Sequence, residues 1–346
     1  MLLQYIGESA MIKVAMIDSG IEYNKAIFEK CVVDGISIAK NCDGKIFISK
    51  DYIDENGHGT LCASVLYREC PEVKLFVIKI FQKELSVDID ILERALEYLL
   101  EIDVQIISMS ISLIDCNKKE NRIKKVCDKL QQQKKILISA VTNGKKRSKP
   151  AEYREVIGVR GAVLENNDEV WFSNLKRINS IIDDVPYLHY RGNGKYSLFG
   201  MCNSYATAKL SGKIARDMYE NENISIRQIR KNLMKESRYK LWIEEQIKRS
   251  KRYPIFKDKS IVYEACKMRR LEGVLQSFFD LDSKEDLYTY ALYSKRIGNG
   301  MWYYHTLAQV LEKEYMFKFE TYSEISKFDF VSIFSIYKLL KEKLLW

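Results

Sequence analysis

The stretch that decides the fold is IKVAMIDSG, residues 12–20. Residues 12–17 form a short, mostly apolar run, and Asp18-Ser19-Gly20 ends it abruptly. A short apolar run that stops at turn residues is typical of a strand buried on both faces of a parallel sheet. The pattern predicts a strand that delivers Asp18 at its carboxyl end, where sites assemble in open α/β sheets. For Asp18 taken alone, an ordinary turn aspartate is the alternative.

Strand and helix signals alternate along the chain beyond this stretch. An amphipathic helix is expected at residues 88–101, with its leucines on one face. Strands are expected at residues 73–81, 105–111, 135–141 and 156–163. This alternation predicts an α/β fold with a doubly wound, mostly parallel sheet.

The segment NGHGT, residues 56–60, supplies a histidine between two glycines. The chain has only three histidines, and neither His189 nor His305 has a glycine beside it that would let a substrate approach closely. The apolar run that follows His58 predicts that this imidazole lies at the start of a helix. A loop histidine, with the glycines as turn formers, is the alternative.

The segment NSYATA, residues 203–208, opens a stretch of small residues that predicts a helix packed closely on the sheet. Ser204 would lie at the positive end of the helix dipole, where developing negative charge is stabilised. A simple N-cap serine is the alternative.

The order Asp, His, Ser with these flanks resembles the subtilisin-like serine peptidases over about residues 10–240. The resemblance implies that Ser204 is the nucleophile, His58 its base and Asp18 the carboxylate that orients the imidazole. It also implies that Asn143, which follows the run at residues 135–141, donates its side-chain amide to the oxyanion. Asn143-Gly144 can also be read as a turn dipeptide.

The chain departs from the family pattern at two places. Around Ser204 it reads CNSYATA where the family has Gly-Thr-Ser-Met-Ala-x-Pro, so a glycine and a proline are missing. Residues 108–113, SMSISL, resemble the family's Met-Ser-Leu-Gly-Gly strand, which receives the substrate as an added strand. The substrate-binding residues implied are Ser108, Ser110, Ile111 and Ser112. Because the glycines of that strand are absent, a narrower cleft and a selective substrate are expected.

The length of 346 residues predicts two domains, a peptidase domain at residues 1–240 and a helical domain at residues 241–346. The end of the chain resembles an acyl carrier protein, with helices expected at residues 271–279, 301–315 and 329–341. The position of that family's modified serine falls on Gly300-Met301-Trp302, so no thioester is carried and a degenerate carrier-like unit would recognise a partner or peptide. Its candidate surface is aromatic: Trp302, Tyr303, Tyr304, Tyr315, Phe317 and Phe319. An unrelated small helical bundle remains the alternative.

Charge and cysteine usage exclude several classes of function. The net charge is +9, but the basic residues are interleaved with acids and no nucleic-acid motif is present, so no nucleic-acid partner is expected. The basic run at residues 145–147 can attract an acidic peptide or be a solvated loop. The eight cysteines lack zinc-ligand or disulfide spacing, which favours reduced thiols and no cofactor. Two of them, Cys62 and Cys202, lie near the proposed base and nucleophile in sequence. Residues 41–56 are acidic without the spacing of a calcium loop, so no metal is assigned.

No signal peptide and no apolar run long enough to span a membrane are recognised, so a cytoplasmic protein without a membrane partner is expected. Together these features predict a selective serine endopeptidase that acts on a peptide or protein substrate. The role that fits is removal of the leader from a ribosomally made precursor, with the precursor or a maturation protein bound by the C-terminal domain. General intracellular turnover and a non-catalytic peptide-binding scaffold are the alternatives.

Overall fold

The computed structural model describes residues 11–22, 26–82, 84–111, 113, 120–221, 224–300 and 303–345. The chain divides into two compact units that are interleaved in sequence. The first unit comprises Met1–Asp184 and Met201–Lys251, and the second comprises Val185–Gly200 and Arg252–Trp346. The domain boundary after residue 240 stays a prediction about folding.

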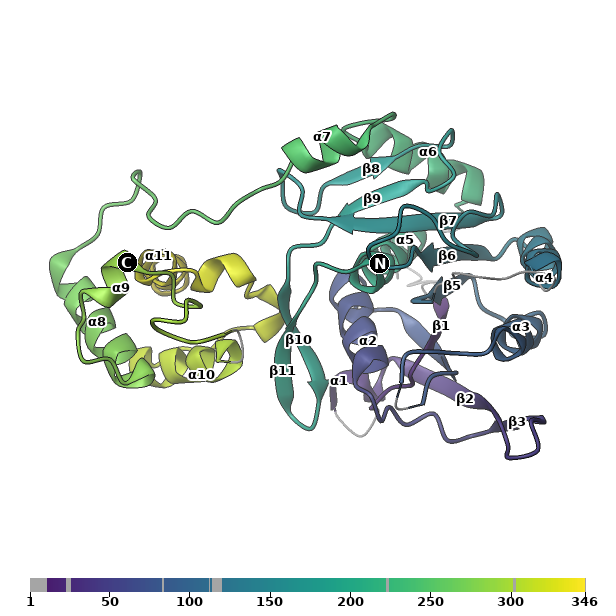
Figure 1. Ribbon diagram of the computed structural model, residues 1–346, viewed down its shortest axis with the longest axis horizontal. Coiled ribbons are helices and arrows are strands. Elements are labelled where there is room, and N and C mark those ends of the chain that lie inside the picture. Colours follow the sequence, from purple (N-terminus) through teal and green to yellow (C-terminus); the bar gives the residue numbers. More distant parts are fainter. Residues whose placement is uncertain are drawn as a thin grey trace, which may run out of the picture. The chain divides into compact units, whose positions relative to one another are not determined.

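The first unit is built on a nine-stranded sheet in the described residues, with the order β3-β2-β4-β1-β5-β6-β7-β9-β8 (Figure 1). The strands are β1 (Lys13–Asp18), β2 (Val32–Lys40), β3 (Ile46–Ser49), β4 (Lys74–Lys79), β5 (Ile106–Met109), β6 (Ile136–Ala140), β7 (Val156–Ala162), β8 (Val170–Phe172) and β9 (Ser180–Asp183). The strands β2, β4, β1, β5, β6, β7 and β9 pair in parallel, whereas the edge strands β3 and β8 pair antiparallel. The predicted α/β class with a mostly parallel sheet is confirmed.

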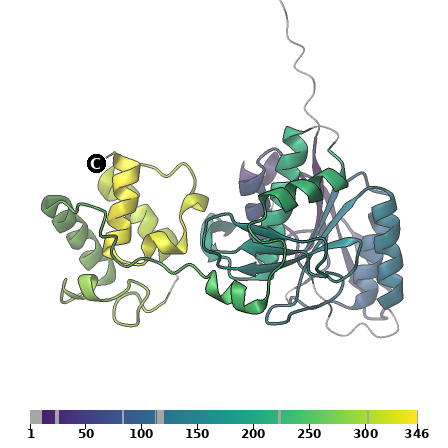
Figure 2. The same ribbon diagram turned by 90° about the horizontal axis from the view of Figure 1, so that it is seen from above.

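Helices cover both faces of this sheet. They are α1 (Ala26–Glu29), α2 (His58–Glu69), α3 (Ile89–Tyr98), α4 (Glu120–Gln132), α5 (Asn203–Glu220), α6 (Ile226–Glu236) and α7 (Glu244–Arg249). Figures 1 and 2 show α3 and α4 side by side on one face, with α2 and α5 on the other. No helix within the described ranges has the length and apolar character needed to cross a bilayer.

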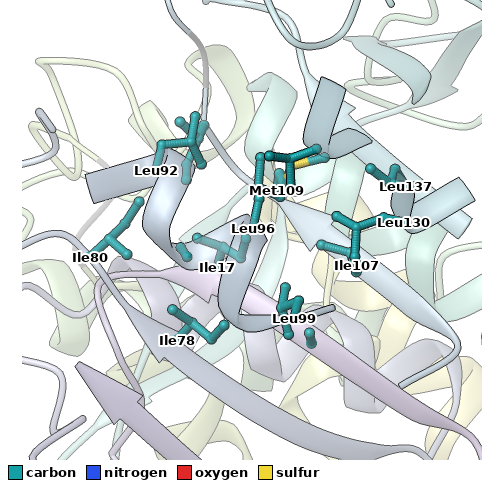
Figure 3. Packing of buried hydrophobic residues seen from close by; sticks show 14 of the residues in the cluster. Ile17, Ile78, Ile80, Leu92, Leu96, Leu99, Ile107, Met109, Leu130 and Leu137 are labelled. Atoms are coloured by element: carbon teal, nitrogen blue, oxygen red, sulfur yellow. The ribbon is translucent and has the colours of Figure 1, made fainter. Parts of the chain in front are cut away.

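The core between the sheet and the α3/α4 layer explains why the central strands read as apolar runs. Ile17 of β1, Ile78 of β4 and Ile107 of β5 pack against leucines of the two helices (Figure 3). Leu96 of α3 and Leu130 of α4 are fully buried among them. Removing a buried leucine of this kind costs about 2–5 kcal/mol of unfolding free energy. This packing fixes the sheet, and with it the strand ends that carry the site.

The second unit combines a hairpin with helices. Its elements are β10 (Tyr187–Gly192), β11 (Lys195–Phe199), α8 (Ala265–Phe279), α9 (Asp286–Thr289), α10 (Tyr304–Tyr315), the 3-10 helices η2 (Tyr322–Glu324) and η3 (Lys327–Phe330), and α11 (Ile333–Leu344). The C-terminal region is helical as predicted. The expected helices overlap α8, α10 and α11, but α8 begins before the expected residue 271 and α11 after the expected residue 329. Residues 301–302 lie outside the described ranges. The hairpin joins this unit because Leu188 lies in the same core as Leu307 and Tyr337.

The aromatic surface predicted for this unit is mostly core. Tyr304, Tyr315 and Phe319 are buried, and Tyr303 and Phe317 are half-buried. Trp302 lies outside the described residues. These rings therefore stabilise the unit more than they face solvent. The resemblance to acyl carrier proteins stays a prediction.

Candidate active site

Asp18 and His58 form a hydrogen-bonded pair at the carboxyl end of β1. Asp18, the last residue of β1, is fully buried, and its Oδ1 lies 2.7 Å from Nδ1 of His58. A carboxylate oxygen only accepts, so in the neutral imidazole the proton lies on Nδ1, and Nε2 is the ring nitrogen that carries the lone pair. An imidazole in this tautomer can take a proton from a hydroxyl.

Two glycines allow this pair to form. Gly20 has a φ of 108°, which favours glycine, and a Cβ on Gly59 would lie 2.1 Å from the carbonyl oxygen of Gly20. Between them, the Gly59 N–H donates to Ser19 Oγ at 2.9 Å. The backbone after β1 and the start of α2 therefore touch, and this contact sets His58 against Asp18.

Asp54 organises the same turn, and the sequence analysis missed it. Its Oδ1 accepts from Ser19 Oγ at 2.9 Å and from the Gly57 N–H at 2.8 Å. Its Oδ2 accepts from the N–H and the hydroxyl of Thr60, at 2.8 and 2.6 Å. One carboxylate thus ties the loop after β1 to the first turn of α2. An aspartate three residues before Gly57 was the available signal, since such side chains often accept from the start of a helix.

The environment of His58 perturbs its pKa. Burial alone would lower this pKa, but the neighbouring Asp18 carboxylate more than offsets that effect and raises the pKa above its ordinary value. The side chain of His58 keeps 15% of its surface exposed. A base whose conjugate acid is stabilised in this way accepts a proton readily.

Cys62 packs beneath the imidazole. Its Sγ lies 3.9 Å from Nδ1 of His58 and 3.5 Å from Oγ of Ser110. Asp18, His58 and Cys62 are the group of potential metal ligands found in the described residues, with ligand atoms within 4.8 Å of one another. Burial raises the pKa of Cys62 to about 12, so the thiol is protonated, whereas metals bind the thiolate.

Ser204 lies in the first turn of α5 and is half-buried. Helix α5 packs tightly on α2, because a Cβ on Gly212 would lie 2.6 Å from Cβ of Glu69. Burial raises the pKa of Cys202, and the His58 imidazole partly opposes that rise, so the segment just before Ser204 is within electrostatic range of His58. The helices that begin at His58 and near Ser204 therefore lie against each other.

Asn143 lies at the start of the same helix. It follows β6, is exposed, and its Oδ1 accepts from the Asn203 N–H at 3.0 Å. Because the oxygen of the amide faces that donor, Nδ2 is the group left to donate elsewhere. Asn203 is itself fixed, since its Nδ2 donates to Val141 O at 2.7 Å and its Oδ1 accepts from the Gly161 N–H at 2.8 Å. Asn203 thus anchors the turn in which the family's glycine is missing.

Most of the side chains of the predicted substrate strand that the structure describes are engaged in packing or hydrogen bonds within the protein. Ser108 is 1% exposed, and its Oγ accepts from Ser211 Oγ of α5 at 3.0 Å, so this side chain holds α5 on the sheet. Ile111 is buried and its carbonyl oxygen accepts from Ser139 Oγ at 3.2 Å. Ser110 is half-buried against Cys62, and Ser112 lies outside the described residues.

The other two histidines have structural surroundings. His189 is fully buried and lies edge-on to Phe199, and His305 packs against Tyr196 and Tyr322 in the second unit. Lys145, Lys146 and Arg147 are exposed beyond Asn143. Only His58 of the three lies between two glycines and against the carboxylate at the end of β1.

The fold and the site define a class: an α/β protein in which a buried carboxylate at the end of a parallel strand orients a histidine at the start of a helix. The family model of the subtilase family, peptidase family S8, matches residues 9–252. The chain belongs to this family.

Curated relatives match parts of the chain. An intracellular serine protease of Paenibacillus polymyxa is 27% identical over 221 residues, which are 59% of this chain and 65% of that protein. The minor extracellular protease Epr of Bacillus subtilis (strain 168) is 28% identical over 174 residues, which are 47% of this chain and 25% of that protein. The chain thus spans less than two thirds of the length of either relative.

Among solved structures, Sphericase shares the fold with a TM-score of 0.53 and 19% identity, covering 66% of this chain and 83% of that chain.

Proposed function

We propose that the chain is a serine endopeptidase in which Ser204 is the nucleophile, His58 the general base and acid, and Asp18 the carboxylate that orients His58. The observation that carries the proposal is the hydrogen bond of 2.7 Å between Nδ1 of His58 and the fully buried Asp18. It leaves Nε2 as the proton acceptor, which is the requirement of acyl transfer by a serine.

In the proposed reaction, Ser204 Oγ attacks the carbonyl carbon of the scissile peptide bond while its proton passes to Nε2 of His58. The Asn143 side-chain amide and the Ser204 backbone N–H donate to the oxyanion. His58 then protonates the leaving amine, the C–N bond breaks and an acyl ester on Ser204 remains. A water that gives its proton to His58 attacks this ester, and collapse releases the acid product and regenerates Ser204.

Two backbone hydrogen bonds support the proposed selectivity. The Leu113 N–H donates to Lys149 O at 2.7 Å, and the Lys149 N–H donates to Leu113 O at 3.2 Å. These two bonds tie the chain just beyond the substrate strand to the loop that follows Asn143. An incoming peptide therefore has a shorter stretch of free backbone to pair with than the full predicted strand, which favours a restricted set of substrates.

The biological role that we propose is removal of a leader segment from a ribosomally made precursor in the cytoplasm, with the second unit recognising the precursor. The seven cysteines in the described residues are all free, which suits a reducing compartment. General intracellular turnover would call for more free backbone beside the substrate than the Leu113–Lys149 bonds leave.

The test compares the full chain with its Ser204→Ala variant on a random peptide library and on a cellular peptide extract. A selective peptidase releases products from few sequences with the wild type and none with the variant. Broad cutting of the library contradicts selectivity. Peptide binding without any product by wild type favours the non-catalytic scaffold instead.

A further inference from the structure

The second unit contains a cavity of about 430 Å³ between its hairpin and α10. Residues of β10 and β11 form one wall, and the start of α10 forms the other. The lining residues are Leu188, Arg191, Lys195, Tyr196, Ser197, Leu198, Tyr304, His305 and Thr306. A cavity of this size accommodates one or two side chains of a peptide.

The chemistry of the cavity suits a carboxylate beside an apolar group. Arg191 and Lys195 are exposed cations at the hairpin turn, and no carboxylate is among the lining residues. Tyr196 and His305 form an aromatic wall, with their rings 5.0 Å apart. Burial lowers the pKa of His305, an effect that Glu312 partly opposes, so His305 is a neutral wall and not a third cation. The positive charge is therefore concentrated at the hairpin turn.

The hairpin also offers an unpaired backbone edge next to this cavity. In the described residues, β11 pairs only with β10. The Leu188 N–H donates to Ile325 O at 2.9 Å, so it points away from β11, and Leu188 and Leu198 form a non-hydrogen-bonded pair. In an antiparallel ladder, hydrogen-bonded and non-hydrogen-bonded pairs alternate. The Tyr190–Tyr196 pair lies two positions from Leu188–Leu198, so it is also a non-hydrogen-bonded pair.

It follows that the N–H and C=O groups of Tyr196 and Leu198 point to the free edge of β11. These are two of the residues that line the cavity. The backbone edge and the side-chain cavity thus meet at the same two residues. This combination is what a bound extended peptide requires, with main-chain bonds for affinity and a pocket for specificity.

We propose that the free edge of β11 and the adjoining cavity bind an extended, acidic segment of the peptide substrate as a third strand of the hairpin sheet. An apolar side chain of that segment enters the cavity, and its carboxylates pair with Arg191 and Lys195. The proposal rests on the proposed function as a peptidase, because the segment belongs to its substrate. A free phosphate or nucleotide would use the cations but not the backbone edge.

Binding is measured by fluorescence anisotropy on the full chain carrying Ser204→Ala, so that no probe is cleaved. The probe is a fluorescein-labelled peptide in which leucine alternates with glutamate. The control is a peptide with the same label in which leucine alternates with lysine. The glutamate peptide is expected to bind and the lysine peptide to bind at least about tenfold more weakly. Equal binding of the two peptides contradicts the proposal.

Charge reversal locates the site. Arg191→Glu with Lys195→Glu should weaken binding of the glutamate peptide by about tenfold or more. The matched control is Lys259→Glu with Lys295→Glu, which reverses two exposed lysines of the same unit that do not line the cavity. If both double variants weaken binding equally, the effect is one of net charge and the proposal fails.

Backbone recognition is tested on the probe and not on the protein. Successive N–H groups of a strand point to opposite edges, so an added strand bonds β11 through alternate residues only. One glutamate peptide is N-methylated on its leucine amides and another on its glutamate amides. Strand addition predicts that one of them binds and the other does not. If both methylated peptides bind, or if neither binds, strand addition is contradicted.

Each variant is also prepared with Ser204 intact, and this protein is treated with a fluorophosphonate to test whether the serine reacts. If the wild type labels but the glutamate peptide does not bind, this inference fails and the peptidase proposal stands. If the wild type does not label, the proposed function fails, whatever the peptide does.

Discussion

The two units differ in the kind of residues on which their proposed functions depend. In the first, each chemical group stands at the end of a buried element: Asp18 ends β1, His58 begins α2 and Ser204 lies in the first turn of α5. In the second, the features that suit binding are an edge strand and a cavity, built from residues that form no motif. Chemistry demands particular atoms at fixed positions, whereas peptide recognition can be built from backbone and charge. Removing the reacting groups of the first unit should therefore impair turnover of every substrate, whereas substitutions at the edge strand and cavity of the second should change only which peptides are used.

The largest effect on activity is expected from Ser204→Ala, a substitution in the first unit. It should lower kcat by about a millionfold, the size that loss of the nucleophile has in subtilisin itself. The loss should be the same for a short ester and for a long peptide, because the ester needs only the first unit. Steady-state kinetics on both substrates measure it.

The control is Ser211→Ala in the same helix, whose hydroxyl bonds Ser108 and not the site. This variant should lose stability but keep the reaction. If Ser204→Ala were about as active as the wild type, Ser204 would not be the nucleophile.

Asp18→Asn should lower kcat/KM by about 10⁴-fold, since an amide no longer fixes the tautomer of His58. The pH profile gives a second reading. His58 must be neutral to act as a base, and Asp18 raises its pKa, so wild-type activity should appear only as pH rises through a value above about 6.5.

Without the carboxylate, burial alone lowers the pKa of His58, so the acid limb of Asp18→Asn should move to lower pH. Residual activity of the variant is followed across the same buffers. An unchanged acid limb would mean that another group controls the profile.

Asn143→Ala should lower kcat by about 10²- to 10³-fold with little change in KM, because an oxyanion donor acts mainly in the transition state. Asn143 is exposed, but its loss leaves the Asn203 N–H without its acceptor, so a modest fall in melting temperature should accompany the loss of kcat. A variant with a raised KM and a normal kcat would place Asn143 in substrate binding, and the turn dipeptide would then be the better interpretation.

Asp54→Ala should cost about 2–4 kcal/mol of unfolding free energy, because it leaves several donors of one turn without their acceptor. The matched control is Asp51→Ala in the same loop, where the exposed carboxylate accepts from the Ile53 N–H at 3.2 Å. Urea unfolding of both variants measures the difference. Equal and small losses would show that Asp54 does not hold the turn.

The contrast between the units also explains what the sequence could predict. The parallel sheet was predictable because buried strands read as apolar runs, and the pairing of Asp18 with His58 followed from the resemblance to the subtilisin-like peptidases. Asp54 gave a weaker signal, its position three residues before Gly57, because the donors that it accepts from, on Ser19, Gly57 and Thr60, meet only after the loop folds. The assignment of residues 185–200 to the second unit depends on Leu188 packing with distant residues. A contiguous division of the sequence cannot reveal such a contact.

The most direct test of the central claim, a serine activated by the Asp18–His58 pair, is active-site labelling with a fluorophosphonate followed by mass mapping of the modified peptide. The account predicts one adduct, on Ser204, in the folded wild type, and its loss in His58→Ala, which keeps the hydroxyl but lacks the base. An adduct on another serine, or equal labelling of Ser204 without His58, would contradict it.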